Sequence, residues 1–133
     1  MSPDKEKDEE AIKKWVESMF SYMASNDLDN FLSLAAEDII LLPPNMQSIH
    51  GIEAVKDLIQ PWFESLVMTH EIGETEIMID SDLAYVRIEY KDRYWPKEGG
   101  ETTVMDNKGL YILRRERNGA WKMTRNIWNR NPM

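Results

Sequence analysis

Hydrophobic residues recur at helical spacing in the first part of the chain. Between residues 8 and 25 they fall three or four positions apart, which predicts an amphipathic helix with one wide apolar stripe. The stripe consists of Ile12, Trp15, Val16, Met19, Phe20 and Met23. The pattern breaks at Asn26 and Asp27, either of which can cap a short second helix. A third helix is expected over residues 52–63, and Pro61 should break or kink it near its end.

Beyond Val67 the pattern changes to the alternation of hydrophobic and polar residues that is typical of strands. Strands are expected at about residues 38–42, 69–79, 83–94, 103–115 and 121–129. Pro43 and Pro44 end the first of them, and Asn118-Gly119 indicates a tight hairpin before the last. Helices followed by a meander of long antiparallel strands predict an α+β fold in which the helices cover one face of the sheet.

The third long strand of this meander is apolar on both faces. Gly109, Tyr111 and Leu113 share one face, and Leu110 and Ile112 share the other. Helices on one side of the sheet would leave the second apolar face in water, and a partner is the simplest way to cover it. We therefore expect a homodimer that forms through this sheet face.

Composition limits the class of protein. The 133 residues have the size of one domain, expected at residues 9–131 behind a flexible charged N-terminus at residues 1–8. That N-terminus lacks the apolar segment of a signal peptide, and no hydrophobic run approaches the roughly 20 residues of a membrane span. The chain also contains no cysteine, which excludes disulfides and thiol chemistry. These features predict a cytoplasmic protein without a membrane partner.

The formal charge is −8 and is unevenly distributed. From Asn107 onward the chain carries seven basic residues and one acid, so the remainder carries −14. The basic segment is either the solvated edge of two strands or a patch for an anion or RNA. Because the acidic chain as a whole repels phosphate groups, we expect no nucleic-acid partner.

Several short motifs follow one another in a characteristic order. They are NDLDNF at 26–31, AED at 36–38, PPN at 43–45, SIHG at 48–51 with Ala54, DLAYVR at 82–87, GLY at 109–111, RR at 114–115, NGAW at 118–121 and IWN at 127–129. In this order the chain resembles, from about residue 9 to 131, the SnoaL-like and ketosteroid-isomerase-like proteins of the nuclear-transport-factor-2-like superfamily. The resemblance implies a cystatin-like fold, a cone-shaped curved antiparallel sheet wrapped around N-terminal helices with a pocket at its wide end. Such proteins are usually dimeric and include isomerases, dehydratases, cyclases and non-catalytic association modules.

The resemblance does not extend to the catalytic set of ketosteroid isomerases. Their carboxylate base corresponds to Pro43, their oxyanion tyrosine to Met19, and their neutral acid falls near Tyr111. Neither a proline nor a methionine side chain transfers a proton, so this mechanism is excluded.

By the same resemblance, a ligand pocket should be lined by Trp15, Met19, Tyr90, Tyr111, Asn126 and Trp128. Hydroxyls, an amide and flat apolar walls suit a small, mostly apolar ligand. Asp92 is the one carboxylate that continues the face of Tyr90, and it is either a speculative base near the pocket mouth or an exposed strand-end aspartate.

The remaining motifs point to no cofactor. The glycines form no phosphate-binding or dinucleotide-binding pattern, and His50 and His70 lack the carboxylate spacing of a zinc site. His50 lies in the turn before Gly51, where we expect a structural hydrogen bond, and His70 begins a strand, where a structural and a functional role are both open. We expect a small-molecule-binding protein with lyase, isomerase or cyclase chemistry; the alternative is a non-catalytic association or partner-binding module.

Overall fold

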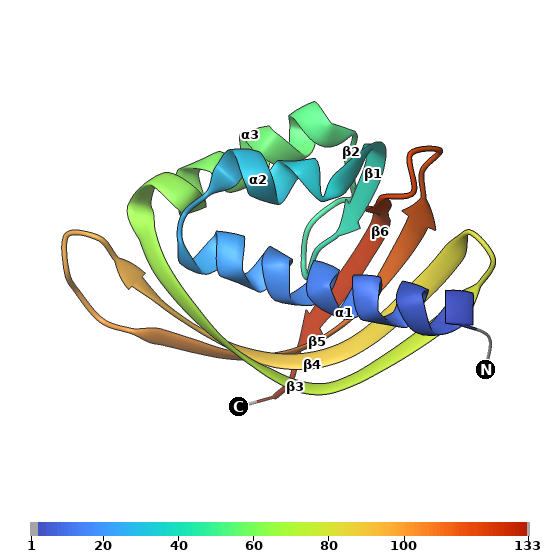
Figure 1. The fold of residues 1–133 in the computed structure, drawn as a ribbon. Coiled ribbons are helices and arrows are strands. Elements are labelled where there is room, and N and C mark those ends of the chain that lie inside the picture. Colours follow the sequence, from blue (N-terminus) through green and yellow to red (C-terminus); the bar gives the residue numbers. More distant parts are fainter. Residues whose placement is uncertain (1–2, 133) are drawn as a thin grey trace.

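The computed structural model describes residues 3–132. The elements are α1 (Pro3–Ala24), α2 (Leu28–Ser33), β1 (Ala35–Leu42), β2 (Ile49–His50), α3 (Ile52–Ser65), β3 (Leu66–Asp80), β4 (Leu83–Pro96), β5 (Thr103–Arg115) and β6 (Trp121–Arg130). Figure 1 shows a strongly curved sheet with the helices on its concave side. The predicted α+β class and curved sheet are confirmed.

The sheet has the strand order β2-β1-β6-β5-β4-β3. Strands β3 to β6 form the expected antiparallel meander. Strand β1 instead pairs with β6 in parallel, and short β2 adds an antiparallel edge to β1. The sheet is therefore open and contains one parallel pair that joins the first strand to the last.

Helix α1 begins earlier than the sequence pattern predicts. We expected residues 1–8 to be a flexible tail, but the helix already begins at Pro3, and residues 1–2 lie outside the described part of the chain. A proline is favoured in the first helical turn, and two acidic residues there interact well with the helix dipole. The Arg115 guanidinium also donates to Asp8, with an Nη2–Oδ2 distance of 2.9 Å. None of the described helices is long and apolar enough to cross a membrane.

Helix α3 continues through Pro61 to Ser65, so of the two expected effects of Pro61, a break or a kink, the break is wrong. A proline in the helix removes the donor to the carbonyl of Asp57. Asp57 and Pro61 are both exposed, so that carbonyl can bond to water. The Ser65 hydroxyl donates to the Pro61 carbonyl at 2.7 Å and supports the last turn.

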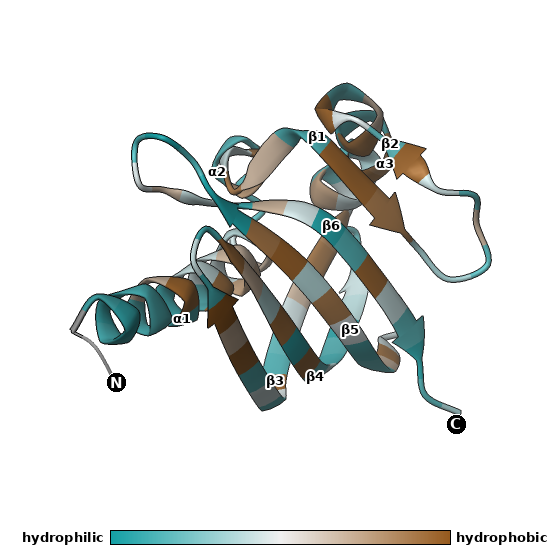
Figure 2. Ribbon diagram, turned by 90° about the vertical axis from the view of Figure 1, so that its right-hand side faces the viewer, coloured by the Kyte–Doolittle hydropathy of each residue, from teal (hydrophilic) through white to brown (hydrophobic). Residues whose placement is uncertain are grey.

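The core lies between the apolar stripe of α1 and the concave face of the sheet. Hydrophobic and hydrophilic residues alternate along β4 and β5, as the banding in Figure 2 shows. The most deeply buried side chains are Ile12, Ile39, Val55, Val86, Ile88, Tyr111 and Leu113. Because alternate strand residues point inward, the inner row of β4 continues from Val86 and Ile88 to Tyr90 and Asp92.

Candidate functional site

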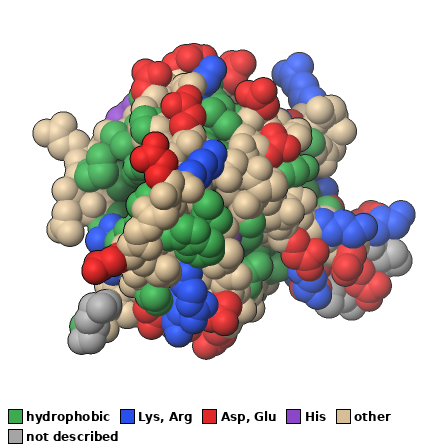
Figure 3. Space-filling model, turned by 90° about the vertical axis from the view of Figure 1, so that its left-hand side faces the viewer, with side chains coloured by type: hydrophobic (Ala, Val, Ile, Leu, Met, Phe, Trp, Pro, Cys, Tyr) green, Lys and Arg blue, Asp and Glu red, His purple; other side chains and the backbone are tan. Residues whose placement is uncertain are grey.

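The concave side of the sheet encloses a cavity of about 360 Å³. Its walls are mostly apolar and come from α1, α3 and β1, whereas its polar groups come from β3 to β6. Figure 3 shows the left-hand side of the molecule in Figure 1, where hydrophobic side chains lie exposed among acidic ones. The volume falls at the small end of the range of ligand pockets.

A histidine and an aspartate meet in this cavity. His70 on β3 and Asp92 on β4 are direct cross-strand partners. The distance from His70 Nδ1 to Asp92 Oδ1 is 2.6 Å, and Asn107 Nδ2 donates to Asp92 Oδ2 at 3.1 Å. Both carboxylate oxygens therefore have partners. The His70 side chain is 3% exposed and that of Asp92 is 23% exposed.

This contact determines which nitrogen of neutral His70 carries hydrogen. An ionised carboxylate only accepts hydrogen bonds, so Nδ1 must be the donor to Asp92 and Nε2 keeps its lone pair. Nε2 is buried and has no hydrogen-bond partner within residues 3–132. The Phe20 ring packs on the imidazole with a centroid distance of 5.1 Å. The arrangement holds a buried imidazole nitrogen without a protein partner in one orientation and in a largely apolar setting.

Two tyrosine hydroxyls lie in the same cavity. Burial raises the pKa of Tyr90 above its ordinary value, and the Asp92 charge raises it further. Burial, followed by the neighbouring Tyr90, raises the pKa of Tyr111 well above its ordinary value. Both tyrosines are therefore neutral at physiological pH and can donate a hydrogen bond. Asn126 adds a buried Oδ1 that has no partner in the described chain.

The structure brings most of the predicted site residues together. Met19, Tyr90, Tyr111, Asn126 and Trp128 all line the cavity, and so does Asp92. That they bind a ligand, and that Asp92 is catalytic, stays a prediction.

Trp15 lies outside the cavity lining. It is buried in the core, with its ring centroid 6.1 Å from that of Tyr111. Its Nε1 donates to the Leu34 carbonyl at 3.2 Å. The Trp15 indole thus packs against the Tyr111 ring and helps to fix its position.

Sequence reasoning missed His70 and Asn107 as members of the site. Asn107 is 2% exposed and bonds to Asp92, yet a single asparagine within a strand carries no recognisable pattern. In the sequence His70 is ambiguous because it begins a strand, and the irregularity in β3 that decides which face it lies on is visible only in the structure. Within residues 3–132, no three metal-ligating side chains are grouped so as to hold a metal ion. Proton transfer by side chains is the chemistry that this set of residues offers.

Comparisons with known proteins agree with this fold. A family model described as the SnoaL-like domain matches residues 16–124. A ketosteroid isomerase-like protein from Erwinia carotovora atroseptica superposes with a TM-score of 0.78 at 20% identity, covering 92% of this chain and 95% of its own. A conserved protein from Planctomyces limnophilus gives 0.86 at 21% identity, with 95% and 99% covered. A hexachlorocyclohexane dehydrochlorinase from Novosphingobium barchaimii gives 0.82 at 14% identity, with 97% and 90% covered. No curated protein matches the sequence significantly.

Proposed function

The chain belongs to the SnoaL-like domain family, and on that premise we propose that it is an enzyme that transfers protons on a small, mostly apolar substrate. The reaction is that of a lyase, isomerase or cyclase. The observation that carries this proposal is the buried pair of His70 and Asp92, whose free Nε2 belongs to a cavity-lining side chain. A structural histidine in a core normally has both ring nitrogens satisfied.

His70 acts as the general base in this proposal. Nε2 takes a proton from a carbon next to a carbonyl group, and the electron pair of the broken C–H bond moves onto the carbonyl oxygen. Asp92 holds the ring in the reactive tautomer and stabilises the imidazolium that forms. The neutral hydroxyl of Tyr90 or Tyr111 donates to the developing oxyanion. His70 then returns the proton to another carbon in an isomerase, or to a leaving group in a lyase.

The names of structural neighbours support proton abstraction as the reaction class. One neighbour is a dehydrochlorinase and another is a ketosteroid isomerase-like protein. In this chain Pro43 and Met19 occupy the positions that resemble the isomerase base and oxyanion tyrosine, and both line the cavity as inert side chains. In this proposal His70 on β3 replaces the carboxylate base of the isomerases.

Solvent deuterium exchange tests the proposal without knowledge of the natural substrate. Aryl ketones and alicyclic ketones that stabilise the protein against heat are incubated with it in D₂O, and the carbon next to the carbonyl is followed by NMR. We expect exchange above the buffer rate for at least one binder. His70→Gln should lower that rate by about 10²–10⁴-fold. Asp92→Asn should also lower it, because an amide no longer requires hydrogen on Nδ1.

His50 provides the matched control. It is exposed, and its Nε2 bonds to the Ser48 hydroxyl at 2.9 Å. His50→Gln should leave the exchange rate unchanged. If His70→Gln binds the same ketone and exchanges it as fast as the parent protein, the proposed base is wrong.

We further propose that two copies of the chain associate through the outer face of the sheet. Leu110 on β5 is the direct cross-strand partner of Ile127 on β6, and Ile112 lies two residues along β5 on the same face. Ile127 is 41% exposed. An apolar strip in the middle of a sheet face, flanked on the β4 side by the ion pair of Arg87 with Glu74, is typical of a surface that another molecule covers.

A further inference from the structure

Arg130 is the one lysine or arginine among the cavity-lining residues of the described chain. It follows Asn126 and Trp128 at alternate positions of β6, so the three side chains share the concave face. Its side chain is exposed and forms no hydrogen bond or ion pair within residues 3–132. A cation therefore stands at the edge of a mostly apolar cavity without a counter-ion from residues 3–132.

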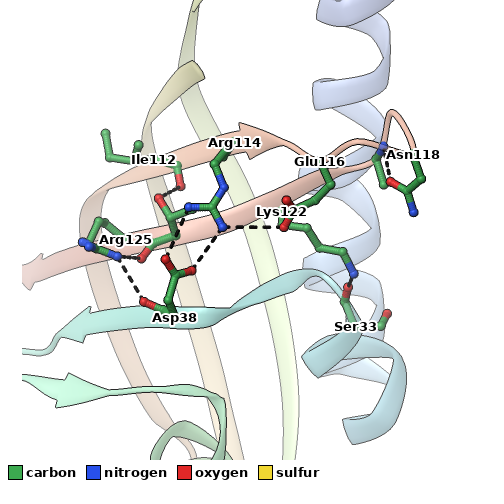
Figure 4. Close-up of polar contacts among 10 residues, drawn as sticks. Ser33, Asp38, Ile112, Arg114, Glu116, Asn118, Lys122 and Arg125 are labelled. Carbon is green, nitrogen blue, oxygen red and sulfur yellow. Dashed lines mark hydrogen bonds and ion pairs between the residues drawn. The ribbon is translucent and has the colours of Figure 1, made fainter. Parts of the chain in front are cut away.

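Five other arginines of the described chain have polar partners. Arg87, Arg93, Arg114 and Arg115 form ion pairs with carboxylates. On β6 itself, the Arg125 guanidinium donates to the Asp38 carbonyl at 3.2 Å, as Figure 4 shows. The exposed Arg117, in the turn between β5 and β6, likewise forms no ion pair within residues 3–132, so what distinguishes Arg130 is its place in the cavity lining.

Asp92, the one carboxylate that lines the cavity in the described chain, does not supply that partner. Its two oxygens bond to His70 and Asn107, and it forms no ion pair with Arg130. Arg130 lies opposite Asn107 in the register of β5 and β6, and Asn107 lies opposite Tyr90. Tyr90 is therefore two strands away, about 10 Å at the usual spacing between strands. His70 lies on β3, one strand beyond Tyr90, so the strands of His70 and Arg130 are about 15 Å apart, and a molecule with its reacting carbon near His70 and a negative group at Arg130 must bridge the space between these two side chains.

We propose that Arg130 selects substrates that carry a carboxylate, so that the substrate class is small apolar organic acids. The acid group lies at the cavity edge on the guanidinium, and the apolar body lies inside beside Trp128. The cavity of about 360 Å³ equals about twelve water molecules at about 30 Å³ each, which suits a substrate of one or two rings. This assignment rests on the proposed function, because it places the reacting carbon at His70.

Matched probes of equal shape test the assignment. The affinities of 2-naphthoate and its neutral amide, 2-naphthamide, are measured by isothermal titration for the parent protein, Arg130→Gln and Arg125→Gln. We expect the parent protein to bind the acid about tenfold more tightly than the amide, because a guanidinium–carboxylate pair is stronger than a neutral contact. Arg130→Gln should lose this preference by weakening the acid alone, whereas Arg125→Gln, an arginine of the same strand on the outer face, should keep it.

Equal affinities of acid and amide for the parent protein would overturn the assignment, as would no binding of either probe or a preference that survives in Arg130→Gln. The proposed function fails separately, because deuterium exchange of ketones does not depend on a carboxylate. Exchange that depends on His70, together with equal binding of the two probes, refutes only the role of Arg130. An acid preference that depends on Arg130, together with exchange indifferent to His70, refutes only the proposed base.

Discussion

Asn26 illustrates how a single residue sets the relative positions of the elements around the cavity. Its φ of 57° is left-handed, a conformation that asparagine tolerates better than most residues. From this position Nδ2 donates to the carbonyls of Phe63 and Leu66, both at 2.9 Å. The side chain thereby ties the turn after α1 to the junction of α3 and β3. Phe63 and Leu66 line the cavity, so its shape depends on this residue.

Two substitutions separate the contributions of Asn26. Asn26→Gly keeps the left-handed backbone but removes both hydrogen bonds, and we expect it to lower the free energy of unfolding by about 1–3 kcal/mol. Asn26→Ala should cost about 1 kcal/mol more, since alanine disfavours a positive φ. Urea denaturation at neutral pH measures both. An alanine variant as stable as the glycine variant would contradict this reading.

At the scale of elements, β3 shows why the site could be only partly predicted. Its pairing with β4 shifts by one residue between Ile72 and Thr75, so even-numbered residues point inward before the bulge and odd-numbered residues point inward after it. Gly73 lies in the bulge, where an added Cβ would lie 3.0 Å from the Glu89 carbonyl oxygen. The bulge turns His70 into the cavity, and a strict alternation counted along β3 does not reveal this.

The alternation of hydrophobic and polar residues predicts those parts of the structure that depend on neighbouring residues in the chain. Alternation predicted the four long strands closely, and the face of Tyr90 led to Asp92 because β4 is regular. The parallel pairing of β1 with β6 was not predictable, since it joins segments about 80 residues apart and no turn specifies it. For the same reason, the contact between Arg115 and Asp8 depends on the completed fold.

Arg115 fastens the first turns of α1 to β5, and this contact has a consequence at low pH. The hydrogen bond from Arg115 lowers the pKa of Asp8 below its ordinary 3.8. A carboxylate with a depressed pKa stabilises the fold above pH 3.8 and loses that contribution as the pH falls through the lower, folded-state value. Asp8→Asn should therefore lower stability at pH 7 by up to about 1 kcal/mol, because solvent screens an ion pair near the surface, and it should flatten the loss below pH 3.8.

Thermal unfolding between pH 2.5 and 7 tests the role of Asp8. Glu17→Gln, which neutralises an exposed acid on the same helix, serves as the control and should follow the parent curve. An Asp8→Asn curve that runs parallel to the parent curve through the acid range would show that the ion pair does not stabilise the helix.

At the scale of the whole molecule, the sheet has two faces of different character. The concave face supplies the cavity, and the outer face carries the strip formed by Leu110, Ile112 and Ile127. The same strand β5 thus contributes Tyr111 to the cavity and Ile112 to the proposed contact between copies. A dimer would cover the outer face of β5 and so restrict the motion of the strand that carries Tyr111 in the cavity wall.

Ile112→Glu should convert the proposed dimer into a monomer. A charge at the centre of an apolar interface is not compensated by a partner, so the mass measured by light scattering should fall by half. Met46→Glu places a charge on an exposed apolar residue away from this face and should leave the mass unchanged. A parent protein of monomeric mass, or an Ile112→Glu variant of unchanged mass, would refute this interface.

The pairing of β1 with β6 determines when the sheet can be completed during synthesis. Strand β1 leaves the ribosome about 80 residues before β6, which at 5–20 residues per second is a delay on the order of ten seconds. Throughout that interval the nascent chain holds α1 and β1 with their apolar surfaces uncovered. Because β6 supplies part of the lining, the cavity exists only after translation has reached the last strand.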